Sequence, residues 1–145
     1  MDGAEIEIRW ASGPEDVHGA VAVREQVFCV EQGVPLEEEL DGRDEEAMHI
    51  VAVDDGRVVA TLRLLLDGAH AKIGRVAVEL AWRRRGIALR MLDNAVAAAR
   101  ERGCTRTSLA SQTYATALYE RAGFVVDSDV FEEAGMPHVW MRMRL

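Results

Sequence analysis

Alternating apolar and polar residues predict most of the β-strands of this chain. The stretch EIEIRW, residues 5–10, alternates at every position, which is the pattern of a strand with one buried face. Residues 49–78 contain three runs rich in Val, Ile and Leu, separated by DDGR and DGAH, whose Asp-Gly steps favour hairpin turns. These runs therefore predict an antiparallel meander of three strands.

Apolar residues at helical spacing predict two longer helices. Between residues 15 and 32 they recur every three or four positions, and Gly33 and Pro35 then end the pattern. A second apolar face, formed by Ala, Met, Leu and Val, covers residues 88–99, and Gly103 is placed to end that helix. One helix is thus expected before the meander and one after it.

The last third of the chain predicts shorter elements. RTSLAS, residues 106–111, has the pattern of a strand, and residues 114–123 that of a short helix. Residues 124–131 and 138–145 are expected as two strands on either side of the turn EEAGMP. The predicted order β α β β β α β α β β, without an internal repeat, is typical of an α+β or mixed α/β layer fold.

Length and composition indicate one globular domain spanning residues 1–145. Hydrophobic residues make up 49% and charged residues 29% of the chain, as in soluble proteins. No apolar run approaches the roughly 20 residues that span a bilayer, and the N-terminus lacks the pattern of an export signal, so we expect a cytoplasmic protein without a membrane partner. Cys29 and Cys104 lie far apart without a CxxC or a His cluster, which indicates reduced thiols and no metal site. The oligomeric state, monomer or homodimer, is left open.

Negative charge is concentrated in one segment. The formal net charge is −8, which argues against general nucleic-acid binding because such binding neutralises phosphates. Residues 31–46 contain eight acids and one base, so nearly the whole net charge lies there. A segment of this kind is either a solvated loop or a surface that attracts a cation.

Positive charge is concentrated at the start of the second long helix. In WRRRGIALRML, residues 82–92, three arginines precede Gly86, where the helix dipole makes each cation unfavourable by about 0.3 to 1 kcal/mol. An external phosphate or pyrophosphate, bound by backbone N–H groups and guanidinium forks, would explain this placement, and the small residues Gly86 and Ala88 would let it approach. The alternative, arginines that only solubilise a helix end, stays open. The pattern matches neither a P-loop nor GxGxxG.

Two segments resemble motifs of the GNAT superfamily of N-acetyltransferases. RVAVELAWRRRGIALRML is similar to the acyl-CoA-binding signature, and QTYATALYERAGF is similar to a second segment, with Gln112 where Asn is usual. The matching positions of these two segments are Arg83, Gly86, Ala88, Ala115, Leu118, Tyr119, Gly123 and Phe124. The rest of the chain resembles the ElaA/YjcF-type branch, at Arg24, Val27, Phe28, Glu31, Gln32, Glu39, Asp41, Asp44, His49, Gly135, Pro137 and His138. The resemblance covers nearly the whole chain.

The resemblance implies a fold and a reaction. The fold would be a GNAT-like acyl-CoA N-acyltransferase fold, with a mostly antiparallel sheet of about six to seven strands splayed between the fourth and fifth. The reaction would be direct attack of a primary amine, on a small molecule or a peptide, on the thioester of acetyl-CoA, without a metal. Residues implied in acetyl-CoA binding are Val76, Ala77, Val78, Arg83, Arg84, Arg85, Gly86, Ile87, Ala88, Gln112, Ala115 and Leu118. A backbone N–H between Val76 and Val78, freed by a strand bulge, would bind the oxyanion.

The resemblance also implies roles in proton transfer and acceptor binding. Tyr119 holds the position of the acid that serves the leaving thiolate, although its spacing alone also suits a core tyrosine. The acceptor side would include Glu31, Gln32, Glu39, Asp41, Glu132 and His138. All of these except Gln32 are candidates for the general base, and each has an alternative as a solvated acid or a structural histidine. The acidic segment would form the acceptor wall and attract a cationic amine, such as a polyamine, an aminoglycoside-like molecule, a lysine or an N-terminal amine.

Two rival functions remain open at this point. The patterns RxxVF, ExDxxD and ATLRLL also resemble acyl-homoserine-lactone synthases, which take an acyl chain from a carrier protein. A non-catalytic acyl-CoA-binding sensor would keep the arginine loop but would have no use for Tyr119. The intact arginine loop and the Tyr119 segment favour an enzyme that uses soluble acyl-CoA.

Overall fold

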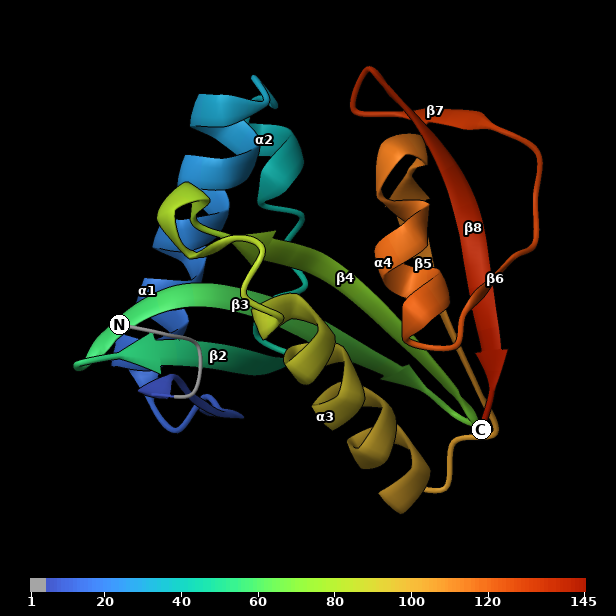
Figure 1. Cartoon of the computed structure of the whole chain (residues 1–145), viewed down its shortest axis with the longest axis horizontal. Helices are drawn as coiled ribbons and strands as arrows, with labels where there is room; N and C mark the ends of the chain where they lie inside the picture. The colour runs from blue at the N-terminus through green and yellow to red at the C-terminus, as the bar shows by residue number, and fades with distance from the viewer. Residues whose placement is uncertain (1–4) are drawn as a thin grey trace.

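One mixed β-sheet runs through the molecule (Figure 1), and the structure, a computed structural model, describes residues 5–145. Within these residues the sheet has eight strands in the order β1-β2-β3-β4-β5-β8-β6, and β7 pairs with β8 outside this path. Neighbouring strands are antiparallel, except that β4 and β5 are parallel. The strands are β1 (Glu7–Trp10), β2 (Met48–Asp54), β3 (Arg57–Asp67), β4 (His70–Val78), β5 (Arg106–Gln112), β6 (Val125–Val126), β7 (Phe131–Glu133) and β8 (Met136–Arg144).

Helices cover both faces of the sheet. They are α1 (Pro14–Arg24), the π-helical η2 (Glu25–Glu31), α2 (Leu36–Glu39), the 3-10 turns η3 (Leu80–Trp82) and η4 (Thr113–Ala115), α3 (Ile87–Glu101) and α4 (Thr116–Arg121). The apolar face of α3 packs on β2, β3 and β4 in the main core, which also contains Tyr119 of α4 and Phe124. Val23 and Val27, from α1 and η2, pack with Ala77 on the opposite face. Among the described residues, no helix is long and apolar enough to cross a membrane.

The sheet opens between β4 and β5. The two strands pair only where His70 to Lys72 lie beside Arg106 to Ser108, and beyond this point they diverge (Figure 1). A mostly antiparallel sheet that splays between its fourth and fifth strands confirms the predicted fold class. The sheet has eight strands and not the expected six to seven, because the single strand predicted at residues 124–131 forms two short strands, β6 and β7.

A bulge interrupts β4 on the way to the opening. Thr61 pairs with Ala77 and Arg63 with Gly74, so Arg75 and Val76 together lie opposite a single residue of β3. Arg75 takes a positive φ of 52°, which is uncommon for a residue with a side chain. The bulge that the resemblance implied therefore lies at Arg75 and Val76, at the edge of the opening.

Two predicted elements differ in detail from the structure. The first helix changes into a π-helix after Arg24, which the sequence could not indicate because apolar spacings of three and four fit both helix types. The single strand predicted at 124–131 is divided into β6 and β7. The N–H of Asp127 still donates to the carbonyl of Trp140, as in the ladder, but the N–H of Trp140 donates to the Ser128 hydroxyl instead of to a backbone carbonyl, and the pairing of β6 ends there.

The first helix lies unusually close to the sheet at Gly19. A Cβ placed on Gly19 would lie 2.6 Å from Cγ2 of Val58 on β3. Glycine is therefore required here by the contact between α1 and β3, not by a turn.

Candidate active site

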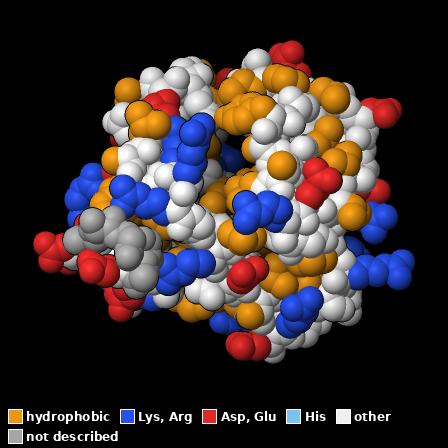
Figure 2. Space-filling model, viewed as in Figure 1, with side chains coloured by type: hydrophobic (Ala, Val, Ile, Leu, Met, Phe, Trp, Pro, Cys, Tyr) orange, Lys and Arg blue, Asp and Glu red, His pale blue; other side chains and the backbone are white. Residues whose placement is uncertain are grey.

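A cavity of about 1000 Å³ occupies the opening between β4 and β5. Figure 2 shows a hollow near the middle of the viewed face, with Lys and Arg side chains beside it. Leu118 and Tyr119 line the cavity from α4 on one face of the sheet, and Phe28, Gln32 and Glu39 line it from η2 to α2 on the other. Side chains from both faces of the sheet therefore line the cavity.

The loop before α3 has the backbone of an anion site. Arg84 and Gly86 take positive φ values of 63° and 76°, and Gly86 forms the N-cap of α3 without a side-chain cap. The first N–H groups of a helix have no partner within the helix, so those that follow Gly86 can bind a ligand. Gly86, Ile87 and Ala88 all line the cavity. The geometry suits a phosphate that enters at the start of α3.

The three arginines of this loop are not equivalent. Arg83 donates from Nε to the carbonyl of Val78 (2.8 Å) and from Nη2 to both carboxylate oxygens of Glu31 (3.0 and 2.9 Å). Arg84 lines the cavity. The guanidinium of Arg85 lies 4.8 Å from the ring centre of Trp82, a cation–π contact, and Arg85 is not among the cavity-lining residues. Arg84 is thus the arginine best placed to meet a phosphate in this structure.

Tyr119 belongs both to the core and to the cavity. Its side chain is 8% exposed, it packs in the main core, and it lines the cavity together with Ala115 and Leu118. Burial raises the pKa of Tyr119 to about 12 because the phenolate would lose its solvation. The two roles that the spacing left open are therefore compatible, and Tyr119 stays a protonated hydrogen-bond donor at neutral pH.

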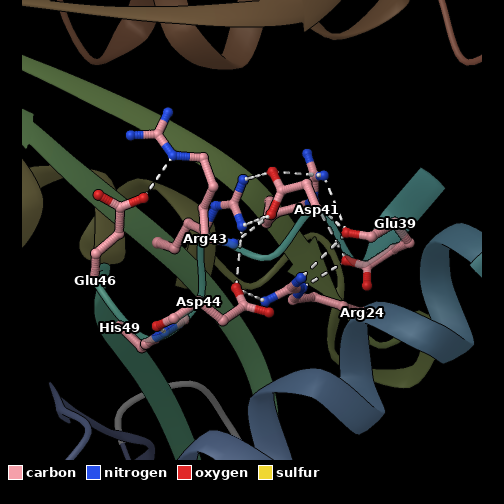
Figure 3. Close-up of polar contacts among 9 residues, drawn as sticks. Arg24, Glu39, Asp41, Arg43, Asp44, Glu46 and His49 are labelled. Atoms are coloured by element: carbon pink, nitrogen blue, oxygen red, sulfur yellow. Dashed lines mark hydrogen bonds and ion pairs between the residues drawn. The ribbon is translucent and has the colours of Figure 1, made fainter. Parts of the chain in front are cut away.

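The side of the cavity predicted to bind the acceptor contains a network of arginines and carboxylates (Figure 3). Arg24, only 1% exposed, donates from Nε to Oε1 of Glu39 (2.6 Å) and from Nη1 to Oδ1 of Asp44 (2.7 Å). Arg63 binds Asp41 through both terminal nitrogens, and it also donates to Asp44 (3.0 Å). Arg75, from the β4 bulge, donates to the backbone carbonyl of Glu39 (3.0 Å).

These contacts stabilise the charged forms of two aspartates. Hydrogen bonds from Arg63 hold the pKa of Asp41 far below its ordinary value. Burial acts against ionisation of Asp44, but hydrogen bonds from Arg24 and Arg63 still lower its pKa. Both carboxylates are therefore ionised and paired at neutral pH.

Three acids of the predicted negative acceptor wall are neutralised by ion pairs. Glu39, Asp41 and Asp44 account for three of the eight acids in the segment, and they are paired with Arg24, Arg63 and Arg75, which all lie outside it. Because these charges cancel, the three acids do not form the cation-attracting surface that the sequence suggested.

Most of the other predicted site residues meet at the cavity. Gln112 lines it and donates to Oε1 of Gln32 (3.0 Å), which joins β5 to η2. The cavity is lined by Gln32, Glu39, Asp41, Val76, Ala77, Val78, Arg83, Arg84, Gly86, Ile87, Ala88, Gln112, Ala115, Leu118, Tyr119 and His138. Glu31 and Glu132 are not among its lining residues, and Glu31 instead binds Arg83.

Sequence reasoning did not assign several cavity residues. Arg63 and Arg75 reach the cavity from neighbouring strands, and Glu133 and Met136 reach it from the hairpin of β7 and β8. Arg75 lies within the segment that carries the acyl-CoA signature, but only the bulge turns it toward α2. No sequence signal separates these residues from ordinary strand residues.

Comparison with known proteins identifies the class first and then the family. The splayed sheet, the uncapped start of α3 and the buried tyrosine fit an acyl-CoA-dependent acyltransferase. The family profile described as "Acetyltransferase (GNAT) domain" matches residues 14–145, so the chain belongs to this family.

Individual relatives agree with the predicted branch. The N-acetyltransferase YjcF of Bacillus subtilis, named as uncharacterized, is 33% identical over 132 residues, which cover 90% of this chain and 94% of YjcF. Escherichia coli ElaA superposes with a TM-score of 0.84 at 25% identity, covering 94% of this chain and 98% of ElaA. An acyl-CoA N-acyltransferase from Pseudomonas aeruginosa also has a TM-score of 0.84, at 31% identity and with the same coverage. The predicted membership of the ElaA/YjcF-type branch is confirmed.

Proposed function

We propose that this acetyltransferase transfers the acetyl group of acetyl-CoA to a primary amine by direct attack of the amine on the thioester. The observation that carries the proposal is the cavity in the splayed sheet, where the start of α3, the bulge of β4 and Tyr119 come together. Membership of the GNAT family supports the reaction class. The likeness to an acyl-CoA N-acyltransferase supports the donor.

The start of α3 would bind the CoA pyrophosphate. The N–H groups that follow Gly86 and the guanidinium of Arg84 offer donors at one end of the cavity. Arg83 already binds Val78 and Glu31 through Nε and Nη2, and Arg85 is held over Trp82. We therefore assign the larger share of phosphate binding to the backbone and to Arg84.

The bulge of β4 would stabilise the oxyanion. A bulge leaves one residue outside the regular ladder, which makes a backbone N–H available in the stretch from Val76 to Val78. A fixed N–H directed at the thioester oxygen stabilises the tetrahedral intermediate because it needs no reorganisation as charge develops.

Tyr119 would bind the departing thiolate as a hydrogen-bond donor. With its pKa raised to about 12, full proton transfer to a thiolate of ordinary pKa about 8.5 would cost roughly 5 kcal/mol. A hydrogen bond stabilises the leaving sulfur without this cost. The proton of the CoA thiol then comes from the attacking amine, not from the phenol.

Thiol release from acetyl-CoA tests the proposal. The purified protein is incubated with acetyl-CoA and spermidine, kanamycin, a lysine peptide or tyramine, and free thiol is measured. We expect amine-dependent release for at least one acceptor, and a kcat about 10- to 100-fold lower in Tyr119→Phe with the KM for acetyl-CoA nearly unchanged. Wild-type turnover in Tyr119→Phe would remove the role of the phenol.

The rival functions give different results. The residues behind the resemblance to acyl-homoserine-lactone synthases include Arg24, Asp41, Asp44 and Arg63, which here form the ion-pair network, so they do not identify the donor. Binding of an acyl carrier protein in preference to acetyl-CoA would support that rival. Thermal stabilisation by acetyl-CoA without thiol release for any amine would support a sensor.

A further inference from the structure

Tyr119 and His138 lie on opposite faces of the sheet at the opening between β4 and β5. Leu109 of β5 and Val139 of β8 pack in the core with Tyr119, so this face of the two strands carries α4. Side chains alternate along a strand, which places Gln112 and His138 on the opposite face. These two residues are direct partners in the β5–β8 ladder and both line the cavity. His138 thus lies across the sheet from Tyr119.

The surroundings of His138 determine which ring nitrogen carries the proton. The side chain is 6% exposed, and Nδ1 lies 2.8 Å from the backbone carbonyl of Met136. A carbonyl can only accept, so Nδ1 is the N–H donor, and in the neutral ring the lone pair is on Nε2. The fold therefore holds the imidazole of His138 at the cavity, and its basic nitrogen, Nε2, is not the one that binds the Met136 carbonyl.

The other groups around the ring favour a base. Nε2 lies 3.8 Å from the carboxylate of Glu133 on β7, which would stabilise the imidazolium. Phe131 of β7 stacks on the ring at 6.0 Å, and Gln112 of β5 is uncharged. Lys72 of β4 reaches this face over the ring of Trp140, beyond Phe131. The charged group in direct contact with His138 is thus an acid.

The competing base candidates are engaged elsewhere. Asp41 is bound by Arg63, which makes it a weak base because its charged form is already stabilised. Glu39 is 2% exposed and binds Arg24. Glu31 binds Arg83, and Glu132 does not line the cavity. Geometry therefore selects one of the five candidates.

We infer that His138 is the general base that removes a proton from the acceptor amine, an inference that rests on the proposed function. Nε2 takes one proton from the substrate ammonium, and the lone pair of the neutral amine forms the C–N bond while the carbonyl π pair moves to oxygen. When the C=O bond re-forms, the C–S bond breaks and its electron pair leaves with sulfur. The surplus N–H proton ends on sulfur, and His138 returns its proton to solvent.

The first experiment does not depend on turnover. The tautomer of His138 is measured in the free enzyme by two-bond nitrogen–proton correlation spectra above the range in which imidazole titrates, with His138→Asn used to assign the signals. We expect protonation at Nδ1 and a lone pair on Nε2. Protonation at Nε2 would overturn the assignment, whatever the enzyme acetylates.

The second experiment separates a base from a structural histidine. The Asn side chain in His138→Asn keeps a donor for the Met136 carbonyl but lacks the basic nitrogen. With acetyl-CoA and ethylamine, which is protonated at neutral pH, we expect kcat to fall at least about 100-fold and the KM for acetyl-CoA to stay constant. With hydroxylamine, which is largely neutral at that pH, the loss should be less than about fivefold.

Controls distinguish failure of the base from failure of the enzyme. His70→Asn should match the wild type, because His70 contacts Ser108 in a separate cleft at the paired end of β4 and β5. Equal losses for ethylamine and hydroxylamine in His138→Asn would overturn the role of the base while the acetyltransferase stands. If the wild type released no thiol with either nucleophile or with any acceptor of the panel, the proposed function would fail and the base role with it.

Discussion

Arg24 is a charged side chain placed deep in the protein, with two carboxylates as partners. Its ion pairs reach residues 15 and 20 positions away in the sequence, and Arg63 reaches Asp41 across 22 positions. The sequence indicates which residues are charged but cannot indicate these pairs, because they exist only once α1, α2 and β3 are packed together. This distance in sequence explains why the acidic segment predicts a solvated loop or a cation-attracting surface and not a set of buried ion pairs.

Removal of Arg24 should destabilise the fold strongly. In Arg24→Met, the buried Glu39 and the half-buried Asp44 lose a shared cation, and breaking a buried pair in this way typically costs about 3 to 5 kcal/mol of unfolding free energy. Urea unfolding at neutral pH measures the change. Arg43→Met is the matched control, because Arg43 pairs with Glu46 at the surface and should be nearly neutral. Equal effects of the two substitutions would show that the buried network does not stabilise the fold.

At the scale of elements, periodicity predicts most of the architecture. The meander, the long helix α3 and its end near Gly103 follow from apolar spacing and turn residues, which act locally. The π-helix could not be predicted, because apolar spacings of three and four fit both helix types. The division of β6 from β7 could not be predicted either, because it depends on contacts with Trp140. The bulge was expected only from the resemblance, because a single extra residue leaves the alternation of β4 almost unchanged.

Close packing of α1 against β3 gives a test at this scale. In Gly19→Ala, the added methyl would overlap Val58, and overpacking of this kind typically costs about 1 to 3 kcal/mol. Val58→Ala combined with Gly19→Ala should recover much of this loss, because the smaller residue makes room for the methyl. Thermal unfolding of the single and double variants measures the coupling, and purely additive losses would contradict the contact.

At the scale of the whole molecule, the net charge of the chain and the local charge at the start of α3 would act in opposite directions on the cosubstrate. A chain of net charge −8 repels a phosphorylated ligand at long range, whereas the proposed phosphate site at the start of α3 would attract it locally. The candidate site was largely predictable because two short motifs place it, and sixteen of the nineteen implied residues line the cavity. The unequal roles of the three arginines were not predictable, since Val78 and Glu31 fix the side chain of Arg83 and Trp82 that of Arg85, whereas Arg84 lines the cavity.

These unequal roles predict a ranking of CoA affinities. Acetyl-CoA should raise the melting temperature of the wild type by mass action. Arg84→Ala should weaken binding more than Arg85→Ala, by a factor of about 10 or more if one charge-assisted hydrogen bond of about 1.5 to 3 kcal/mol is lost. Calorimetric titration with acetyl-CoA and with acetyl-pantetheine, which lacks the pyrophosphate, checks the cause. If both ligands lose equal affinity in Arg84→Ala, this arginine supports the fold and does not bind phosphate.

The divergence of β4 and β5 has a consequence for the order of events. Because residues from both faces of the sheet line the cavity, the proposed reaction lets the donor approach from the side of α3 and α4 and the acceptor from the side of α2. In the proposed reaction each substrate would then have its own entrance, so that neither must leave before the other arrives. Residues at the second entrance can change over evolution to admit a different amine while the first entrance, and with it the use of acetyl-CoA, stays as it is.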